Sequence, residues 1–418
     1  MISTDIVVIG GGPAGLAAAI TASENKKKVI LIERSDELGG ILPQCIHYGF
    51  GNFKFKQMLT GPEYNQLYLD MIRKTDVKIM LDTMVLEIGK DKTVIATNKK
   101  EGIIKIKSDA IVLAMGCRER TRSQILLPGT RPAGVYTAGT TQRMINVEGV
   151  FPGKKIVILG SGDVGLIMAR RFTLEGAMVC GVFEIMQHPG GLTRNIVQCL
   201  DDYDIPLHLS HTVTMIHGNR RVSGVTVAKV DPDSKKVKEG TERYIECDTL
   251  ILAVGLIPEN ELSKTINIEL DETTGGPIVD QSMQTNITGI FACGNVVHVH
   301  DIVDDVSESA EIAGKNAAEY VNKKSKSEKI INVKQGKNVS YVIPQLLRGE
   351  ITDDVIFYFR VKKVMKEVKI TVNTDEKIVK TKNQKIVKPP EMIKIKIPKS
   401  EIRALKAKEM IINVGGRE

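Results

Sequence analysis

Two glycine-rich turns, 150 residues apart, constrain this chain more than any other feature. The first reads Gly10-Gly11-Gly12-Pro13-Ala14-Gly15 and the second reads Gly160-Ser161-Gly162-Asp163-Val164-Gly165. Each follows a short apolar run and precedes a helix-like stretch, at residues 16–23 and 166–175. In this context the first glycine allows a tight strand-to-helix turn, the second lets the backbone approach a pyrophosphate, and the third lets helix and strand pack closely. The two turns therefore predict two dinucleotide-binding units.

An acidic residue ends the second expected strand of each unit. Glu33 closes the apolar run at residues 28–32, and Glu184 holds the equivalent place in the second unit. A carboxylate at this position accepts hydrogen bonds from ribose hydroxyls and repels a 2′-phosphate. Residues 183–188 contain no arginine that would hold such a phosphate, so the second unit is expected to prefer NAD over NADP. The alternative is an ordinary solvated acid at a strand end.

The remaining pattern predicts an α/β fold with two interleaved Rossmann-like domains, β-meanders and a small C-terminal β domain. Meanders are expected at residues 77–106 and 206–247, returning strands at 110–116 and 249–255, and helices at 62–74 and 306–322. The expected domains are the FAD-binding domain in two parts, 1–121 and 258–323, the NAD-binding domain at 122–257, and a basic antiparallel β domain at 330–418. The best linker candidate is residues 323–327.

The positive charge of the chain is concentrated at its end. Residues 321–418 hold 24 Lys and Arg against 11 Asp and Glu, a net charge of +13 that leaves −5 for residues 1–320. A Lys-rich surface of this kind keeps exposed strand edges from associating, and a docking face for an acidic protein is the alternative. Nucleic acid is not an expected partner, because the lysines alternate with apolar residues and form no groove studded with aromatic residues.

Several classes of protein are disfavoured by the composition. No apolar stretch reaches membrane-spanning length, and no Lys or Arg precedes the first apolar run as in a signal peptide. The six cysteines, at positions 45, 117, 180, 199, 247 and 293, show no CxxC or other metal-ligand spacing. We therefore expect a reduced cytoplasmic protein without a metal site.

Together these features resemble the FAD- and NAD-dependent flavoproteins of the pyridine nucleotide-disulfide reductase fold, over residues 1–322. The resemblance rests on both glycine turns, Glu33, Gly39-Gly40, the strand end Ala114-Met115-Gly116 and the turn Phe291-Ala292-Cys293-Gly294-Asn295. It implies that the first unit holds FAD, that the second holds the nicotinamide dinucleotide, and that the late turn closes on the ribityl chain. Asn295 stands where the family carries Asp; its amide can accept a hydrogen bond but brings no charge.

A second departure is the missing redox disulfide, because Cys45 has no second cysteine within reach in the sequence. Residues 39–47, 117–120, 125–135 and 138–140 instead resemble the NAD(FAD)-dependent subunits that accompany glycerol-3-phosphate, opine or proline dehydrogenases, a group related to the flavin subunits of hydrogen cyanide synthase and sarcosine oxidase. Some relatives carry iron–sulfur cysteines after the flavin domain. Residues 294–418 contain no cysteine, so no such cluster is expected there.

The candidate site residues follow from these motifs and from the resemblance. Candidate FAD-binding residues are Gly10, Gly12, Pro13, Ala14, Gly15, Glu33, Arg34, Gly39, Gly40, Ala114, Gly116, Gly294 and Asn295. Candidate NAD-binding residues are Gly160, Gly162, Asp163, Val164, Gly165, Glu184 and Gly255. The candidate catalytic residues are Cys45 and His47.

Other side chains leave alternatives open. Cys45 is either a redox thiol beside the flavin or an unreactive packing residue, and His47 either orients a substrate or partner or is an ordinary loop histidine. Arg118, Glu119 and Arg120 bind phosphate or pair with one another. His298 and His300 face the flavin or solvent, without a metal. Asp301, Asp304, Asp305 and Ser307 are expected to cap the helix at 306–322.

The function expected from this pattern is that of an FAD-dependent NADH:acceptor oxidoreductase that transfers a hydride between NAD(H) and FAD. By resemblance it is the nicotinamide-handling subunit of an oligomeric, heteromeric dehydrogenase, with a glycerol-3-phosphate dehydrogenase-type partner as the first expectation. One alternative is a stand-alone NADH-dependent reductase of peroxide or disulfide that uses Cys45. Another is a non-enzymatic, nucleotide-sensing assembly module.

Overall fold

The computed structural model describes residues 1–323, 330–375 and 377–416, and its contacts divide the chain into two compact units. Unit 1 comprises residues 1–43, 48–117 and 258–418, and unit 2 comprises residues 44–47 and 118–257. The first junction thus lies after Cys117 rather than after residue 121, and the C-terminal β region clusters with the FAD-type unit. Of the expected linker at 323–327, all but Lys323 lies outside the described residues.

The main sheet of unit 1 is built on two long strands, β1 (Ile2–Ile9) and β8 (Gly102–Leu113). They pair in parallel, with Ile6–Ile9 opposite Ala110–Leu113. The second half of β8 also pairs in parallel with β19, whereas its first half pairs in antiparallel fashion with β7. The strand order is β5-β2-β1-β8-β7-β6, with β2 (Val29–Ile32), β5 (Lys78–Met80), β6 (Met84–Ile88), β7 (Thr93–Asn98) and β19 (Ile290–Ala292).

One expectation about this sheet is wrong. Residues 77–106 were expected to form a meander throughout, but β5 pairs in parallel with β2, Ile30–Ile32 opposite Lys78–Met80. The strand joins the buried parallel layer because α2 carries the chain across the sheet before it, as in a βαβ crossover. Only β6, β7 and the start of β8 form the meander.

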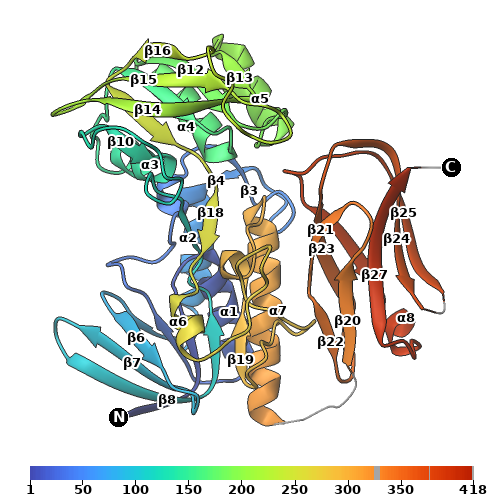
Figure 1. The fold of residues 1–418 in the computed structure, drawn as a ribbon. Helices are drawn as coiled ribbons and strands as arrows, with labels where there is room; N and C mark the ends of the chain where they lie inside the picture. Colours follow the sequence, from blue (N-terminus) through green and yellow to red (C-terminus); the bar gives the residue numbers. More distant parts are fainter. Residues whose placement is uncertain (324–329, 376, 417–418) are drawn as a thin grey trace. The chain divides into compact units, whose positions relative to one another are not determined.

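Helices α1 (Pro13–Glu24) and α7 (Val303–Asn322) pack closely in unit 1, as Figure 1 shows. Small residues permit the approach, because a Cβ on Gly314 would lie 2.4 Å from the carbonyl oxygen of Ala18. The expected packed face of α7 is confirmed, since Ala310, Ala313, Ala317 and Ala318 are buried. The other elements of the unit before its C-terminal region are β3 (Tyr48–Phe50), β4 (Leu59–Thr60), α2 (Gly61–Ile72), α6 (Glu261–Thr265) and the 3-10 turn η3 (Gly294–Val296).

Unit 2 contains a five-stranded parallel sheet in the order β10-β17-β11-β12-β13. A separate three-stranded antiparallel sheet is formed by β14, β15 and β16, so only the later part of the expected meander at 206–247 is antiparallel. The chain enters and leaves this unit through β9 (Cys117–Glu119) and β18 (Leu256–Pro258). Its strands are β10 (Val135–Thr137), β11 (Lys155–Leu159), β12 (Met178–Glu184), β13 (Leu207–Leu209), β14 (His211–Gly218), β15 (Val222–Lys229), β16 (Arg243–Glu246) and β17 (Thr249–Leu252). Its helical segments are η1 (Leu42–Gln44, at the boundary), α3 (Ala138–Asn146), α4 (Asp163–Leu174), α5 (Thr193–Cys199) and η2 (Asp201–Tyr203).

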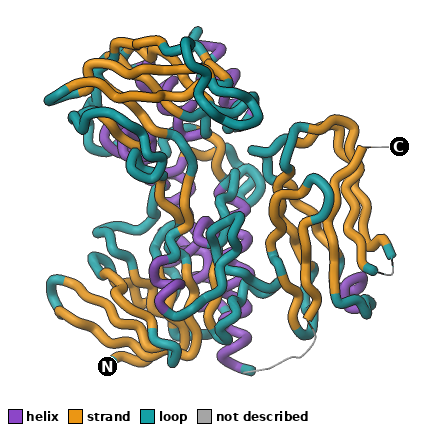
Figure 2. Tube along the Cα trace, viewed as in Figure 1, coloured by secondary structure: helices purple, strands orange, loops and turns teal. Residues whose placement is uncertain are grey.

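The C-terminal β region, residues 330–416, consists of two sheets (Figure 2). One has the order β22-β20-β27-β24-β25 and the other the order β21-β23-β26. The expectation of a purely antiparallel domain is wrong in one place, because β20 and β27 pair in parallel. The elements are β20 (Ile330–Gln335), β21 (Val339–Ile343), β22 (Leu346–Arg348), β23 (Val355–Val361), β24 (Met365–Thr374), β25 (Ile378–Val387), β26 (Ile393–Ile397), α8 (Lys399–Arg403) and β27 (Glu409–Gly416).

The alternating sequence of this region explains its burial. Val368, Ile370 and Val372 of β24 are fully buried in the region's own core. The neighbouring strand β25 lies at the sheet edge and carries lysines at 380, 382 and 385. Charged side chains on an edge strand disfavour pairing with another chain. In the described residues, we find no helix whose length and hydropathy suit it to cross a membrane.

Candidate functional site

The first glycine turn of unit 1 is shaped by close backbone contacts. Gly10 has φ of 104°, and a Cβ there would lie 2.4 Å from the carbonyl oxygen of Ala114, at the end of β8. A Cβ on Gly15 would lie 1.7 Å from the carbonyl oxygen of Gly10. The helix that follows begins at Pro13 after Gly12, whose position carries no side-chain cap. The amides of this helix start are therefore left for a ligand.

The second glycine turn repeats this arrangement in unit 2. Gly160 has φ of 93°, and a Cβ there would lie 2.2 Å from the carbonyl oxygen of Ala253, just beyond β17. A Cβ on Gly165 would lie 2.5 Å from the Cβ of Ala253. Helix α4 again starts after a glycine, Gly162, without a side-chain cap. The same three glycine roles thus recur, with the returning strand as the neighbour in both units.

The two strand-end acids also occupy equivalent positions. Glu33 accepts a hydrogen bond from the amide of Gly11 at 2.6 Å and from the amide of Ser35 at 2.8 Å. Glu184 accepts from the amides of Ser161 and Met186, both at 2.9 Å. Both carboxylates are buried, with 8% and 7% of the residue exposed. Each one fixes its glycine turn and keeps lone pairs that can accept ribose hydroxyls.

In unit 2 two further polar side chains fasten the loop after β12 to the glycine turn. Ser161 Oγ donates to Glu184 at 2.5 Å and accepts from the amide of Gly190 at 2.7 Å. Asp163 accepts from the amide of Leu192 at 2.8 Å and from Asn195 Nδ2 at 2.6 Å. Asp163 was expected to contact the cofactor; in the structure its carboxylate holds this loop. Sequence reasoning assigned no role to Ser161, although it lies inside the motif.

Unit 1 brings the remaining expected FAD residues to its glycine turn. A Cβ on Gly40 would lie 3.1 Å from Gly12 Cα, and one on Gly294 would lie 2.8 Å from Ala14 Cβ. Gly39 has φ of 119° and faces the side-chain amide of Asn65. Gly116 also has a positive φ, of 69°, after the buried end of β8, while Arg34 is exposed beside Glu33. Segments 10–15, 39–40, 114 and 294 therefore form one continuous cradle.

Unpaired buried atoms show that this cradle suits a polar ligand. Asn65 Oδ1, Asp304 Oδ2 and His300 Nε2 are buried and have no hydrogen-bond partner among the described residues. Such acceptors cost free energy unless a donor reaches them. Asn65, which sequence reasoning missed because it lies within α2 and outside every motif, contacts the Gly39 backbone. A bare glycine turn beside orphaned acceptors fits a dinucleotide with a polyhydroxyl chain, such as FAD.

Residues 4–319 match the model of the pyridine nucleotide-disulphide oxidoreductase family. The chain belongs to this family. It is a flavin-dependent pyridine nucleotide oxidoreductase by this membership, and the expected Rossmann-type architecture is confirmed. Residues 320–418 lie outside the matched range.

Among its relatives is one of the opine oxidase subunits of Agrobacterium tumefaciens (strain Ach5), 24% identical over 335 residues, which are 75% of this chain and 64% of the relative. Another is hydrogen cyanide synthase subunit HcnB of Pseudomonas protegens, 27% identical over 290 residues, 64% of this chain and 60% of the relative. The chain thus matches less than two thirds of the length of these two proteins.

Solved structures of the same fold include thioredoxin reductase from T. acidophilum, with a TM-score of 0.62, 22% identity, and coverage of 76% of this chain and 99% of that one. L-proline dehydrogenase from P. horikoshii has a TM-score of 0.51, 21% identity, and coverage of 77% and 56%. At these identities the two structures show the shared fold alone.

The cysteine that follows the Gly39-Gly40 turn does not resemble a redox centre. Cys45 belongs to unit 2, is 6% exposed, and its Sγ lies 3.7 Å from Gln142 Oε1. Burial raises the pKa of its thiol to about 12, so the reactive thiolate is scarce at neutral pH. The candidate redox role of Cys45 is therefore disfavoured. His47 lies two residues further, half-buried, in the same unit.

The charged run after Cys117 has a structural role at its centre. Both carboxylate oxygens of Glu119 lie 2.9 Å from the amide of Gly139, in the first turn of α3. The acid thus stabilises the positive end of that helix. Arg120 donates its backbone amide to the carbonyl of Gly255, at 3.0 Å. Gly255, an expected NAD contact, has φ of 103° and lies beside the Arg120 side chain.

The expectation that four side chains cap α7 is wrong. The helix begins at Val303 after Ile302, without a side-chain cap. Asp304 instead accepts from the amide of Lys54 at 2.9 Å, and Ser307 Oγ lies 2.7 Å from Tyr64 Oη. Asp301 pairs with Arg360 and Asp305 with Lys394, both in the C-terminal β region. Long-range partners outcompete local capping here. His298 and His300 are likewise buried rather than facing solvent.

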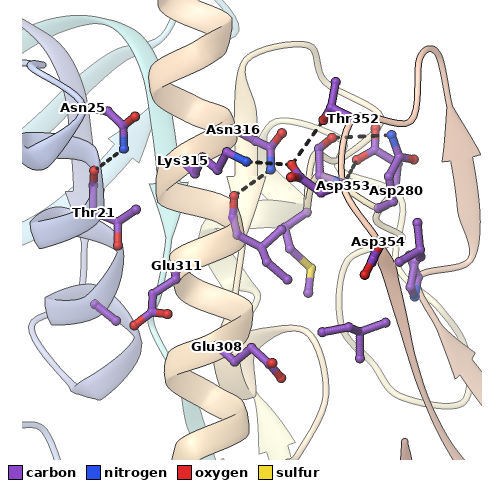
Figure 3. A pocket seen from close by; sticks show the side chains of 18 of the residues that line it. Thr21, Asn25, Asp280, Glu308, Glu311, Lys315, Asn316, Thr352, Asp353 and Asp354 are labelled. Carbon is purple, nitrogen blue, oxygen red and sulfur yellow. Dashed lines mark hydrogen bonds and ion pairs between the residues drawn. The ribbon is translucent and has the colours of Figure 1, made fainter. Parts of the chain in front are cut away.

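Unit 1 also contains a cavity of about 700 Å³ (Figure 3). It is lined by the second half of α1, by α7 and by the C-terminal β region, so it is separate from the glycine turn. Its charges are largely paired: Lys315 bonds Asp353 at 2.7 Å, and Lys54 bonds Glu311. The cavity therefore adds nothing to the dinucleotide cradle.

Proposed function

We propose that this chain is an FAD-dependent NADH:acceptor oxidoreductase that transfers a hydride between NAD(H) and FAD. The observation that carries the proposal is the duplicated geometry, in which a glycine turn, a returning strand and a buried strand-end acid recur in each unit. The family typically binds FAD and NAD(P). We assign FAD to unit 1 and the nicotinamide dinucleotide to unit 2.

The residues of unit 1 suit the task of holding a flavin dinucleotide. The turn at 10–15 offers backbone amides to the pyrophosphate, Glu33 accepts from the ribose, and the Gly294–Asn295 turn lies beside the start of α1. A bound flavin supplies the two-electron acceptor for the hydride. The chain itself has little acid–base chemistry to perform, because its main contribution is to fix the reactants and keep water out.

We further propose that the nicotinamide donor is NADH rather than NADPH. Glu184 is buried and its carboxylate is fixed by three donors from Ser161 and Met186. A fixed negative charge at the ribose position repels a 2′-phosphate. The adjoining loop, residues 185–192, contains no Lys or Arg and is fastened to the glycine turn by Ser161 and Asp163.

We infer that the chain works as the nicotinamide-handling subunit of a heteromeric, oligomeric dehydrogenase in the reducing cytoplasm. Two of its relatives are named as subunits, one of opine oxidase and one of hydrogen cyanide synthase. A glycerol-3-phosphate dehydrogenase-type flavoprotein is our first choice of partner. The buried, protonated Cys45 argues against a stand-alone peroxide or disulfide reductase. All six cysteines, each within the described residues, are without a disulfide, which agrees with a reducing compartment.

Affinity purification of the tagged chain from its native source tests whether it is part of a larger dehydrogenase. We expect a second redox protein to be recovered in a stoichiometric amount, and we expect NADH to reduce an artificial dye through the complex much faster than NADPH does. A monomer that oxidises a small organic substrate or reduces peroxide alone would contradict this proposal.

A further inference from the structure

The side-chain amide of Asn295 is held in one orientation by His300. Asn295 Oδ1 lies 3.0 Å from the backbone nitrogen of His300 and 3.2 Å from its ring nitrogen Nδ1. A backbone N–H can only donate, so the atom facing it must be the amide oxygen. That oxygen therefore accepts from both groups, which requires Nδ1 to carry the ring proton.

This orientation reverses what the turn presents to a ligand. With its oxygen engaged, Asn295 points its NH2 group away from His300, and Nδ2 lies 3.6 Å from Cys117 Sγ. An ionised aspartate at the same position could only accept hydrogen bonds. Asn295 instead offers donors, which suit hydroxyl or carbonyl oxygens of a ligand.

The ring of His300 is suited to this role because it stays neutral. Burial, with Arg360 nearby, lowers the pKa of His300 to about 3. The other charged side chains that face the ring are Lys394 from β26 and its partners Glu308 and Asp305 from α7. A neutral ring with its proton on Nδ1 has a bare acceptor at Nε2, the atom that has no partner in the described residues.

The segment that carries His300 is held by the C-terminal β region. Arg360 of β23 pairs with Asp301 and donates to the carbonyl of Val299 at 3.2 Å. The amide of Met392 donates to the other oxygen of Asp301 at 2.5 Å. The ion pair is well shielded, with 17% of the arginine side chain and 14% of the aspartate side chain exposed. The ring of Tyr358, also on β23, lies 5.7 Å from the His300 ring.

We propose that the C-terminal β region positions the flavin turn: Arg360 holds residues 299–301, and His300 orients the amide of Asn295 so that its NH2 group faces the cofactor's oxygen atoms. This inference rests on the proposed function, because it takes the cradle of unit 1 as the FAD site. It gives the β region, which lies outside the family match, a role in cofactor binding. His300 and Arg360 are positioning residues rather than catalytic ones.

A double-mutant cycle on FAD affinity tests the link between His300 and Asn295. Apoprotein is titrated with FAD, and the dissociation constant is read from quenching of flavin fluorescence. His300→Leu removes the ring donor and should weaken binding by about 3- to 10-fold, the usual effect of one hydrogen bond. His300→Asn keeps a donor close to the position of Nδ1 and should restore affinity to within about twofold. Asn295→Ala should weaken binding as His300→Leu does, and the double variant should be no worse than either.

Arg360→Met extends the cycle to the C-terminal region, with Arg403→Met as its matched control. Arg403 is an arginine of the same region that pairs with Glu350 and the carbonyl of Ile351, away from the turn. We expect Arg360→Met to weaken FAD binding but to add no loss in the Asn295→Ala background, and Arg403→Met to leave affinity unchanged. Thermal unfolding of each apoprotein reports folding, and the His300 pair of variants decides the question if Arg360→Met does not fold.

The outcomes separate this inference from the proposed function. A wild-type chain that binds no FAD overturns both. A chain that binds FAD but shows additive losses for His300→Leu and Asn295→Ala, or no rescue by His300→Asn, overturns this inference alone.

Discussion

Replacing Glu184 by glutamine should weaken NADH binding while leaving the flavin in place. The carboxylate accepts three hydrogen bonds, two from Ser161 and one from Met186. Glutamine keeps the shape but retains one acceptor oxygen, so its NH2 group must face one of these donors. It also lacks the charge that strengthens a bond to a ribose hydroxyl.

The size of the effect follows from the usual strength of such bonds. One hydrogen bond to a charged group contributes about 1.5 to 3 kcal/mol, which corresponds to a rise in the KM for NADH of about 10- to 150-fold. We expect kcat to change much less, because the glycine turn that positions the pyrophosphate is intact. The loss of folding stability, about 1 to 3 kcal/mol for the disturbed Met186 amide, is small enough for the unit to stay folded.

Steady-state reduction of a dye by NADH measures this change, and the bound flavin per chain is measured on the same samples. Glu33→Gln is the matched control, since Glu33 has the equivalent contacts in unit 1. It should lower FAD retention and leave the KM for NADH of the remaining holoprotein within about twofold. An unchanged KM in Glu184→Gln, or loss of flavin from that variant alone, would refute the assignment of the two units.

Three further changes have defined outcomes. Cys45→Ser should leave NADH-to-dye turnover within about twofold, because burial raises the pKa of the thiol to about 12 and the thiolate is scarce; loss of most activity would restore the redox role. Burial also raises the pKa of Asp280 from 3.8 to about 6, so its stabilising contribution is full below pH 3.8 and is lost as the pH rises through 6. Urea unfolding should show Asp280→Asn reducing this pH dependence by up to about 3 kcal/mol, and identical profiles would contradict it. Replacing Lys380 and Lys385 by valine on the edge strand β25 should promote self-association in light scattering, and a chain that stays as dispersed as wild type would argue against edge protection.

The parts of the fold that repeat a short-range pattern could be predicted from the sequence. Gly10 and Gly160 are required by positive φ and close backbone contacts, and each motif contains its own strand, turn and helix start. The small residues of α7 likewise show which face packs. These features are local, so spacing alone reveals them.

The parts that sequence reasoning missed depend on long-range contacts. Asp301 looked like a helix cap, but Arg360, 59 residues later, pairs with it instead. Asn65 lies on a helix without a motif, and only the fold brings it to Gly39. The strand Lys78–Met80 is too short to show whether its partner is parallel or antiparallel. In each case the deciding partner is chosen by topology rather than by neighbouring residues.

The most direct test is an anaerobic titration of the purified holoprotein with NADH, followed by its visible spectrum. The duplicated dinucleotide geometry predicts a yellow protein with one tightly held flavin per chain, which stoichiometric NADH bleaches and NADPH bleaches far more slowly. A colourless chain that cannot be reconstituted with FAD, or a flavin that NADH does not reduce, would contradict the account.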